Sequence, residues 1–458
     1  MAILGLTTAE SFSSDRFKNI RRSVFYFYPN GAAPLTGLIS LLKEEVTNDP
    51  EYKWFEKRLA EQRTTTVAIS STIAIYDTSI TVAAQKVTAA TIAAGNVTFT
   101  ADTQYAIKVA ASPENVFRIG HIIRMAMTDS GGKKQEVLGR VNAINTASDT
   151  PANVLGFIAT RTVTTAVDYD LAANIGIEVL AVGSAFAEGG LDISSGIYTQ
   201  PINPYNLCQI SRAPFSITGT ALKTSLKYDE TGAYKDQAKD ASVAYMIELE
   251  KNYFFGERNL YSSGGQIVRT MGGLLWYLRQ WEAGTNYGVT ASTSDSDDNK
   301  RIIDNAGGTI SDKTYNSYLE RLFRVTNNKS NEKLVLCGSG FLSVINQMYM
   351  GRVCLDASLP FTDTYGMDVV KHKTPFGTVY YKTHPLMSQN AILRNNAFFL
   401  DMQNFVYRYL DGRDVALLKN RQANDADYRK DEWLGETGLE IRFPESHMYL
   451  QNVQDFVP

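Results

Sequence analysis

One long amphipathic pattern limits the architectures open to this chain more than any other feature. Between Gly232 and Arg258, apolar and aromatic side chains recur at steps of three or four residues, at Tyr234, Ala238, Ala241, Tyr245, Leu249 and Tyr253. This spacing aligns them along one stripe of an α-helix. Charged residues of the segment lie largely outside this stripe, among them Lys235, Asp236, Lys239 and Glu250. About 27 residues at a rise of about 1.5 Å each make a rod roughly 40 Å long. The sequence therefore predicts a structural spine helix over 232–258.

A second region, 64–187, has a different composition from the rest of the chain. Threonine, valine, isoleucine and alanine dominate its first part, and between Thr64 and Pro113 the charged residues are Asp77, Lys86, Asp102 and Lys108. Such mixtures favour half-buried strands, and the best candidates are 97–100, 119–125, 136–141 and 176–180. The turn signal at 129–132 separates two of them. We predict that 64–187 is an all-β insertion with its own small core.

The remaining segments alternate helix and strand patterns. A short apolar helix is predicted over 35–43, and the charge-dense segment 43–63 has near-helical spacing of Trp54, Phe55 and Leu59. Ser311 or Asp312 can cap a further helix. The other predicted elements are strands at 333–337, 376–381, 397–401 and 405–410, and a helix over 341–350. The fold class is therefore α+β.

Composition excludes several classes of function. The 458 residues include 45 Lys+Arg and 48 Asp+Glu, a formal net charge of -3, whereas proteins that grip nucleic acid need a basic excess. Apolar runs stay well below the roughly 20 residues of a membrane helix, and the first residues lack the pattern of a signal peptide. The three cysteines, Cys208, Cys337 and Cys354, are far apart and typical of buried thiols made in a reducing cytosol.

Motifs that could carry chemistry are weak. Gly338-Ser339-Gly340 follows a predicted strand and precedes a helix, as in dinucleotide-binding turns, but Ser343 stands where the third glycine belongs. The acidic run 295–298 resembles the start of a calcium loop and lacks its glycine and closing glutamate. A Cys337–His384 pair is conceivable, but the histidines are too scattered for a metal cluster: His121, His372, His384 and His447. We predict no catalytic, cofactor-binding or metal-binding residues, and no enzyme.

Residues near the start of the chain carry a family resemblance. Tyr28-Pro29-Asn30-Gly31-Ala32-Ala33-Pro34-Leu35-Thr36, followed by Asp49-Pro50-Glu51-Tyr52-Lys53-Trp54-Phe55-Glu56, resembles the N-terminal region of a branch of tailed-phage major head proteins. The β-rich stretch, the return at 203–210, the long helix ending in Phe254-Phe255-Gly256-Glu257-Arg258, and the segments 374–387 and 398–401 follow the same order.

The resemblance implies the Hong Kong 97-type (Johnson) capsid fold. It divides the chain into an N-terminal arm (1–63), an extended loop carrying the inserted all-β domain (64–187) and a peripheral domain with the spine helix (188–264). The axial domain (265–373), peripheral strands (374–400) and a C-terminal axial segment (401–458) follow. We expect contacts between neighbouring subunits to come from the aromatic cluster at 25–28 and from 43–63, because arms reaching over neighbours bury area without a large compact interface.

The same resemblance implies a structural role in the virion. The protein would be made and assembled in the host bacterial cytoplasm, forming pentamers and hexamers of an icosahedral head around double-stranded DNA, which it contacts non-specifically. Expected partners are other copies of itself, a separate scaffolding protein, a portal protein and a decoration protein, without a membrane. Two alternatives stay open: an encapsulin-like nanocompartment shell and another virion component. A carbohydrate-binding role of 64–187 has little support, because exposed aromatic clusters are lacking there.

Overall fold

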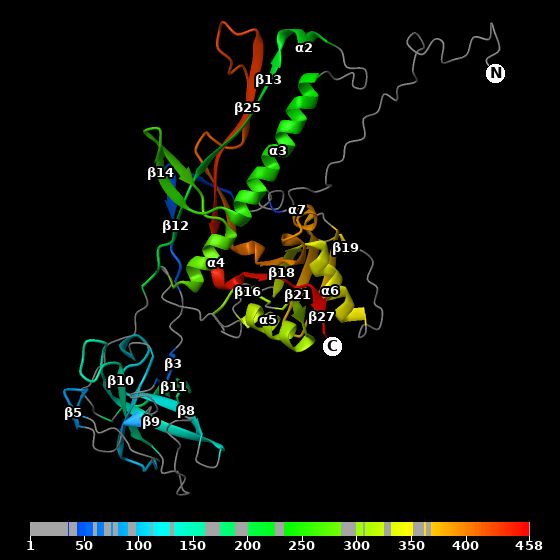
Figure 1. The fold of residues 1–458 in the computed structure, drawn as a ribbon. Helices are drawn as coiled ribbons and strands as arrows, with labels where there is room; N and C mark the ends of the chain where they lie inside the picture. The colour runs from blue at the N-terminus through cyan, green and yellow to red at the C-terminus, as the bar shows by residue number, and fades with distance from the viewer. Residues whose placement is uncertain are drawn as a thin grey trace, which may run out of the picture. The chain divides into compact units, whose positions relative to one another are not determined.

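The computed structural model of the chain divides it into two compact units, Lys57–Pro201 and the combination of Met1–Glu56 with Ile202–Pro458 (Figure 1). The residues that the structure describes are Leu35, 44–57, 62–67, 75–76, 81–89, 98–110, 113–128, 132–160, 175–186, 188, 200–224, 233–284, 299–305, 307–324, 331–350, 361–362 and 368–457. The aromatic cluster at 25–28, most of the predicted helix over 35–43, and the acidic run 295–298 lie outside these residues.

The unit Lys57–Pro201 is built on an antiparallel sheet in the order β3-β11-β8-β9-β10-β7-β4. Its strands are β3 (Arg63–Thr65), β4 (Ile75–Tyr76), β7 (Gln104–Lys108), β8 (His121–Thr128), β9 (Lys134–Ile144), β10 (Val154–Ala159) and β11 (Glu178–Ser184), with a separate hairpin of β5 (Thr81–Ala83) and β6 (Lys86–Ala89). Alternating side chains of β8 and β9 are buried, as expected of strands with one face on a core.

Aromatic rings fill the core of this unit. Phe99, Tyr105 and Phe157 are fully buried, and the Phe99 and Tyr105 ring centroids are 4.7 Å apart. We predicted a strand at 97–100, but 98–100 is not a strand; Thr100 N–H instead donates to the Tyr105 hydroxyl at 2.9 Å. Gly139 leaves room for the Phe157 ring, since a Cβ there would lie 2.2 Å from that ring. The compact unit is wider than the predicted insertion 64–187 at both ends.

In the second unit, the spine helix α3 (Ala233–Phe255) lies along a sheet ordered β1-β23-β25-β13 (Figure 1). The strands are β1 (Glu44–Thr47), β13 (Gln209–Thr218), β23 (Phe405–Leu410) and β25 (Tyr428–Ile441), with β24 (Ala416–Leu418) beside β25. The helix is confirmed, and Tyr245, Leu249 and Tyr253 of the predicted stripe are buried, whereas Tyr234, Ala238 and Ala241 are half-buried. Glu250, which we placed outside the stripe, is also fully buried.

A second, mixed sheet in this unit has the order β16-β26-β22-β18-β21-β20-β19. Its strands are β16 (Ile302–Asp304), β18 (Glu332–Cys337), β19 (Phe361–Thr362), β20 (Asp368–Lys373), β21 (Thr378–Thr383), β22 (Ala397–Leu400) and β26 (Met448–Gln451). Apolar residues of α5 (Asp312–Arg324) and α6 (Ser339–Met350) share one core cluster with those strands. Ser311 caps α5, accepting from Thr314 N–H at 3.3 Å.

Shorter elements complete this unit. They are β2 (Glu51–Lys53) paired with β12 (Tyr205–Leu207), the hairpin β14 (Asn259–Ser263) and β15 (Gln266–Thr270), β17 (Thr309–Ile310) paired with β27 (Asp455–Phe456), and the helices α2 (Gly219–Lys223), α4 (Leu274–Glu282) and α7 (Pro385–Gln389).

The strand pairing differs from the predicted grouping of segments. We placed the strands of 374–400 with the spine helix, but β21 and β22 pair on either side of β18. Conversely, β23 and β25 belong to the predicted axial segment 401–458 and pair beside β13, along α3. The reason is that β22 is buried at every position, and this suits it to the centre of a covered sheet.

The secondary structure of the charge-dense segment 43–63 also differs from the prediction. Where the structure describes it, it forms short strands rather than a helix, and Trp54 is buried while Phe55 is 76% exposed. Tyr52, Trp54 and Glu56 are buried within their own chain, because alternate residues of an extended segment point to opposite sides. The expected contact of this segment with neighbouring subunits stays a prediction, and the exposed Phe55 lies on the side open to it.

Candidate functional site

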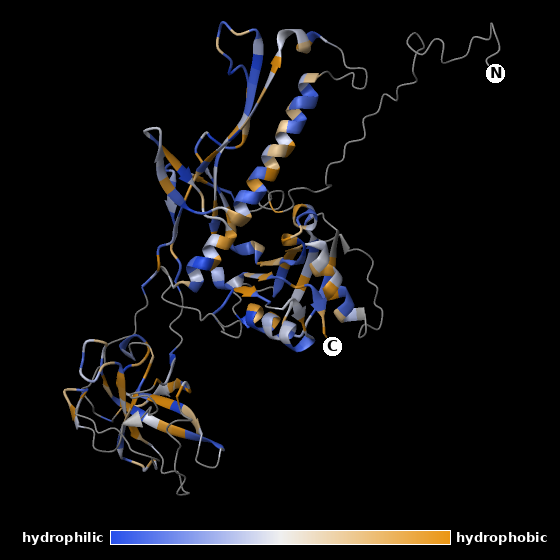
Figure 2. Ribbon diagram, viewed as in Figure 1, coloured by the Kyte–Doolittle hydropathy of each residue, from blue (hydrophilic) through white to orange (hydrophobic). Residues whose placement is uncertain are grey.

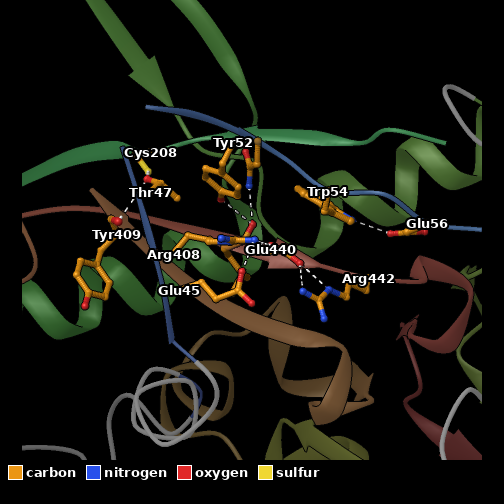
Figure 3. A network of polar contacts seen from close by, with 12 residues as sticks. Glu45, Thr47, Tyr52, Trp54, Glu56, Cys208, Arg408, Tyr409, Glu440 and Arg442 are labelled. Carbon is orange, nitrogen blue, oxygen red and sulfur yellow. Dashed lines mark hydrogen bonds and ion pairs between the residues drawn. The ribbon is translucent and has the colours of Figure 1, made fainter. Parts of the chain in front are cut away.

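The most developed polar site holds the segment 44–56 against the sheet beside α3 (Figure 3). Strand β1 pairs in parallel with β23, so that Glu45 lies opposite Arg408 and Val46 opposite Tyr409. We call this site the segment anchor and define it by Glu45, Thr47, Tyr52, Trp54, Glu56, Cys208, Arg408, Tyr409, Glu440 and Arg442.

A buried carboxylate lies at the centre of the segment anchor. Glu440 is fully buried, and its two oxygens are shared between two guanidinium groups. Arg408 Nε lies 2.7 Å from Glu440 Oε2, and Arg442 Nε lies 2.5 Å from Oε1. Arg408 Nη2 also reaches Glu45 Oε2 at 2.6 Å, which ties β1 to the pair. Because an unpaired buried charge is costly, Glu440 and its arginines depend on one another.

The Tyr52 side chain extends the anchor across β25. Its hydroxyl donates to the Leu439 carbonyl at 3.0 Å, and the Arg408 guanidinium lies 5.7 Å from its ring centroid. Gly438 permits this approach, because a Cβ at that position would lie 2.4 Å from the Tyr52 hydroxyl oxygen. Burial is the largest cause that raises the pKa of Tyr52 well above its usual value. The hydroxyl therefore stays protonated and acts as a donor.

Trp54 and Glu56 extend the segment anchor toward the C-terminal end of β25. Trp54 Nε1–H donates to Glu56 Oε1 at 2.9 Å, and Phe443 N–H donates to the same oxygen at 3.2 Å. Glu56 also forms a bridge with Ile202, the next residue of this unit along the chain. The two chain crossings between the compact units are thus paired with each other.

A second polar contact joins α3 to the other sheet. His384 Nε2 lies 2.8 Å from Glu250 Oε1, and both side chains are buried. The same oxygen accepts from Leu35 N–H at 2.9 Å. Leu35 is fully buried in the core cluster that contains Leu249. One carboxylate therefore links the helix, the residue before α7 and a segment that precedes β1.

A third polar contact is a buried ion pair within the sheet that contains β18. Lys333 Nζ lies 2.9 Å from Asp401 Oδ2 and donates to the Ser446 carbonyl at 3.1 Å. Asp401 N–H donates to His447 Nδ1 at 3.0 Å. Burial, and then the nearby Lys333 charge, lowers the pKa of His447 to about 3. Desolvation also lowers the pKa of Lys333, although Asp401 opposes this shift.

The motifs considered for chemistry have structural explanations. Gly338 and Gly340 form the expected strand–turn–helix corner, but the turn is packed against its own chain: a Cβ on Gly338 would lie 2.2 Å from the Arg394 carbonyl, and one on Gly340 would lie 2.1 Å from Asn395 Oδ1. No side chain would fit at either position. The glycines are therefore required for packing.

The conceivable Cys337–His384 pair is close in space but is not a nucleophile and base. His384 N–H donates to the Cys337 carbonyl at 2.7 Å, whereas the His384 ring faces Glu250. Burial raises the pKa of the Cys337 thiol to about 12, so the thiolate needed for attack does not form at neutral pH. Burial likewise raises the pKa of Cys208 to about 11.

Within the described part of the chain, no group of three or more His, Cys, Asp or Glu side chains is arranged to hold a metal ion. Among those same residues, no helix is long and apolar enough to cross a membrane. The polar contacts among the described residues hold segments of the chain together.

Sequence reasoning missed the central members of these contacts. Glu250 was placed outside the apolar stripe, and the roles of Arg408 and Glu440 were not predicted. One signal was available: Arg408 interrupts the otherwise apolar run Phe405-Val406-Tyr407-Arg408-Tyr409-Leu410. An arginine inside a strand of a buried sheet requires a buried acidic partner.

Comparison with known proteins identifies a family. The sequence matches the family described as SU10 major capsid protein over residues 6–454. A search among curated proteins finds no match.

Solved structures with a similar arrangement include a cyanophage A-1(L) capsid asymmetric unit, with 11% identity and a TM-score of 0.40 over 60% of this chain and 85% of that chain. The capsid of a native GTA particle has 11% identity and a TM-score of 0.38 over 59% and 80% of the two chains. The SrpI encapsulin of Synechococcus elongatus PCC 7942 has 10% identity and a TM-score of 0.34 over 56% and 78%. At these TM-scores the likenesses alone do not assign a fold.

Proposed function

The chain belongs to the SU10 major capsid protein family, and from this premise we propose how it builds a shell. Membership of that family makes it a phage major capsid protein, a structural component of the virion rather than an enzyme. The match over residues 6–454 carries this conclusion, because it covers both compact units.

The proposal is that copies of the chain form pentamers and hexamers of an icosahedral head around double-stranded DNA, with a Hong Kong 97-type fold. In favour of it are the long helix α3, the compact β unit Lys57–Pro201, and the two sheets of the other unit. The proposed subdivision keeps the arm (1–63) and the enlarged extended loop (64–187). It assigns β23 and β25, rather than β21 and β22, to the region of the spine helix.

The segment anchor is suited to hold the base of an arm that a neighbouring subunit pulls on. A chain that reaches a neighbour must be held firmly where it leaves its own subunit, since otherwise a pull on the arm would unravel β1. Glu45 is held by Arg408, and Arg408 by Glu440. We propose that this chain of ion pairs fixes the base of the arm. A separate scaffolding protein, a portal protein and a decoration protein complete the proposed set of partners.

Electron microscopy of the purified protein, combined with analytical ultracentrifugation, tests this function. The protein is studied alone and after co-expression with the candidate scaffolding protein. We expect closed shells, or rings of five and six subunits. A monodisperse monomer under both conditions would overturn the proposal. Shells that enclose a cargo enzyme and no DNA when isolated from infected cells would favour the nanocompartment alternative instead.

A further inference from the structure

The hairpin of β14 and β15 exposes apolar side chains that the described residues of its own unit leave largely uncovered. Leu260 is 58% exposed, Tyr261 47% and Ile267 67%. The two strands pair with each other, and the sheet they form has two strands only. Figure 2 shows hydrophobic segments on this hairpin. Two-stranded sheets are only marginally stable in water unless a hydrophobic face is covered. Further contacts are therefore needed to stabilise this hairpin.

The register of the hairpin separates its two faces. Leu260 lies opposite Arg269, and Ser262 lies opposite Ile267. Because side chains alternate along a strand, Leu260 and Ile267 share one face, and Tyr261 points to the other. Arg269 reaches back to the buried Glu436 of β25 at 3.8 Å. Leu260 lies directly opposite Arg269 and Ile267 lies two pairs nearer the turn, and both stay exposed on this face.

The base of the hairpin is rigidly held. The Arg258 guanidinium lies 3.6 Å from the Tyr205 ring centroid and 4.3 Å from the Trp276 ring centroid, and it donates to the Tyr205 carbonyl at 2.6 Å. Gly273 N–H donates to the Gly256 carbonyl at 2.8 Å, a close approach of two backbones that side chains would prevent.

The tip is closed by a tight turn. Gly264 and Gly265 both have positive φ, which a two-residue turn of this kind requires. The hairpin thus has a held base, a tight turn and an exposed apolar face. These are the features of a preformed binding element and not of a segment that belongs to the core.

We propose that the face carrying Leu260 and Ile267 docks onto a second copy of this chain. The inference rests on the proposed function, since a shell subunit must contact other copies of itself. The small area of the face favours a second copy of this chain over a soluble partner. Stable binary complexes bury roughly 1,200–2,000 Å² in total, far more than two side chains on a hairpin supply. A closed shell adds many small contacts between identical subunits, so a face too small for a soluble partner is sufficient there.

Paired substitutions test the docking face. Ile267→Asp places a charge on the proposed face, and Ser263→Asp places the same charge on the opposite face of the same hairpin. Both positions are exposed, so the unassembled subunit keeps its fold, which circular dichroism and the melting temperature check. We expect the Ile267→Asp variant to give less than a tenth of the wild-type yield of shells, and the Ser263→Asp variant to match wild type.

Photo-cross-linking identifies the occupant. A benzoylphenylalanine introduced at position 267 is irradiated in assembled shells, and the joined peptides are determined by mass spectrometry. We expect a covalent dimer of this chain. Normal shells from the Ile267→Asp variant, equal loss in both aspartate variants, or a cross-link confined to one chain or made to a different protein would each overturn the inference. If the wild-type protein forms no shells or rings, the proposed function fails as well, which distinguishes the two failures.

Discussion

Acid should weaken this subunit through one buried histidine. His447 is fully buried, its Nδ1 accepts from Asp401 N–H, and its pKa is lowered from 6.5 to about 3. Between these two values the unfolded chain binds a proton that the folded subunit does not, so stability falls as the pH falls through this window. Each pH unit costs at most 1.36 kcal/mol per group. From pH 7 to pH 4 the loss from His447 alone is therefore about 3 kcal/mol.

Urea unfolding of the unassembled subunit, followed by tryptophan fluorescence at pH 7 and pH 4, measures this loss. The comparison is with His447→Asn, whose amide oxygen can still accept from Asp401 N–H but does not titrate. Its packing defect lowers stability equally at both pH values and cancels in the difference. The variant should lose about 3 kcal/mol less than wild type between the two pH values. Equal losses in the two proteins would refute the argument that a buried neutral His447 controls acid stability.

Three further outcomes follow from the buried contacts. Lys333→Met removes the cation that is paired with the buried Asp401 and should cost about 3–5 kcal/mol in urea unfolding, whereas adding Asp401→Leu should recover part of this loss; an additive penalty would contradict the pairing. Gly438→Ala should cost about 1–3 kcal/mol because its Cβ meets the Tyr52 hydroxyl, and combining it with Tyr52→Phe should cost less than the sum of the two changes, a coupling that thermal melts of the four proteins can measure. Arg408→Met should make the segment 44–47 easier to cleave in limited proteolysis while the β unit stays intact, and unchanged cleavage would argue against the segment anchor.

Regular patterns in the sequence predicted the elements that depend on local spacing. The steps of three and four residues in 232–258 gave α3 within a few residues of its observed ends. The Thr- and Val-rich composition of 64–187 corresponds to a sheet with its own core, because half-buried strands require side chains of this kind. The strand at 333–337, the following helix and the capped helix at 312 were found in the same way.

Partners distant in the sequence could not be predicted. The pairing of β22 with β18 rather than with the sheet beside α3 depends on which surfaces fit, and alternation within one strand does not encode its neighbours. The stripe of α3 placed Glu250 on the polar side, although its contacts with His384 and Leu35 make burial favourable. Single-residue patterns miss such a carboxylate, because its partners lie 134 and 215 residues away.

The sheet ordered β1-β23-β25-β13 has a consequence for synthesis on the ribosome. Thr47 donates to the carbonyl of Tyr409, a residue made 362 positions later, so β1 has no strand to pair with until translation is nearly complete. At about 5–20 residues per second, this delay lasts roughly 20–70 s. A nascent chain therefore lacks the pairing of β1 with β23 for most of its synthesis. The segment anchor is therefore among the last parts of this unit that can form during synthesis, because both Glu45 and its partner Arg408 must have left the ribosome.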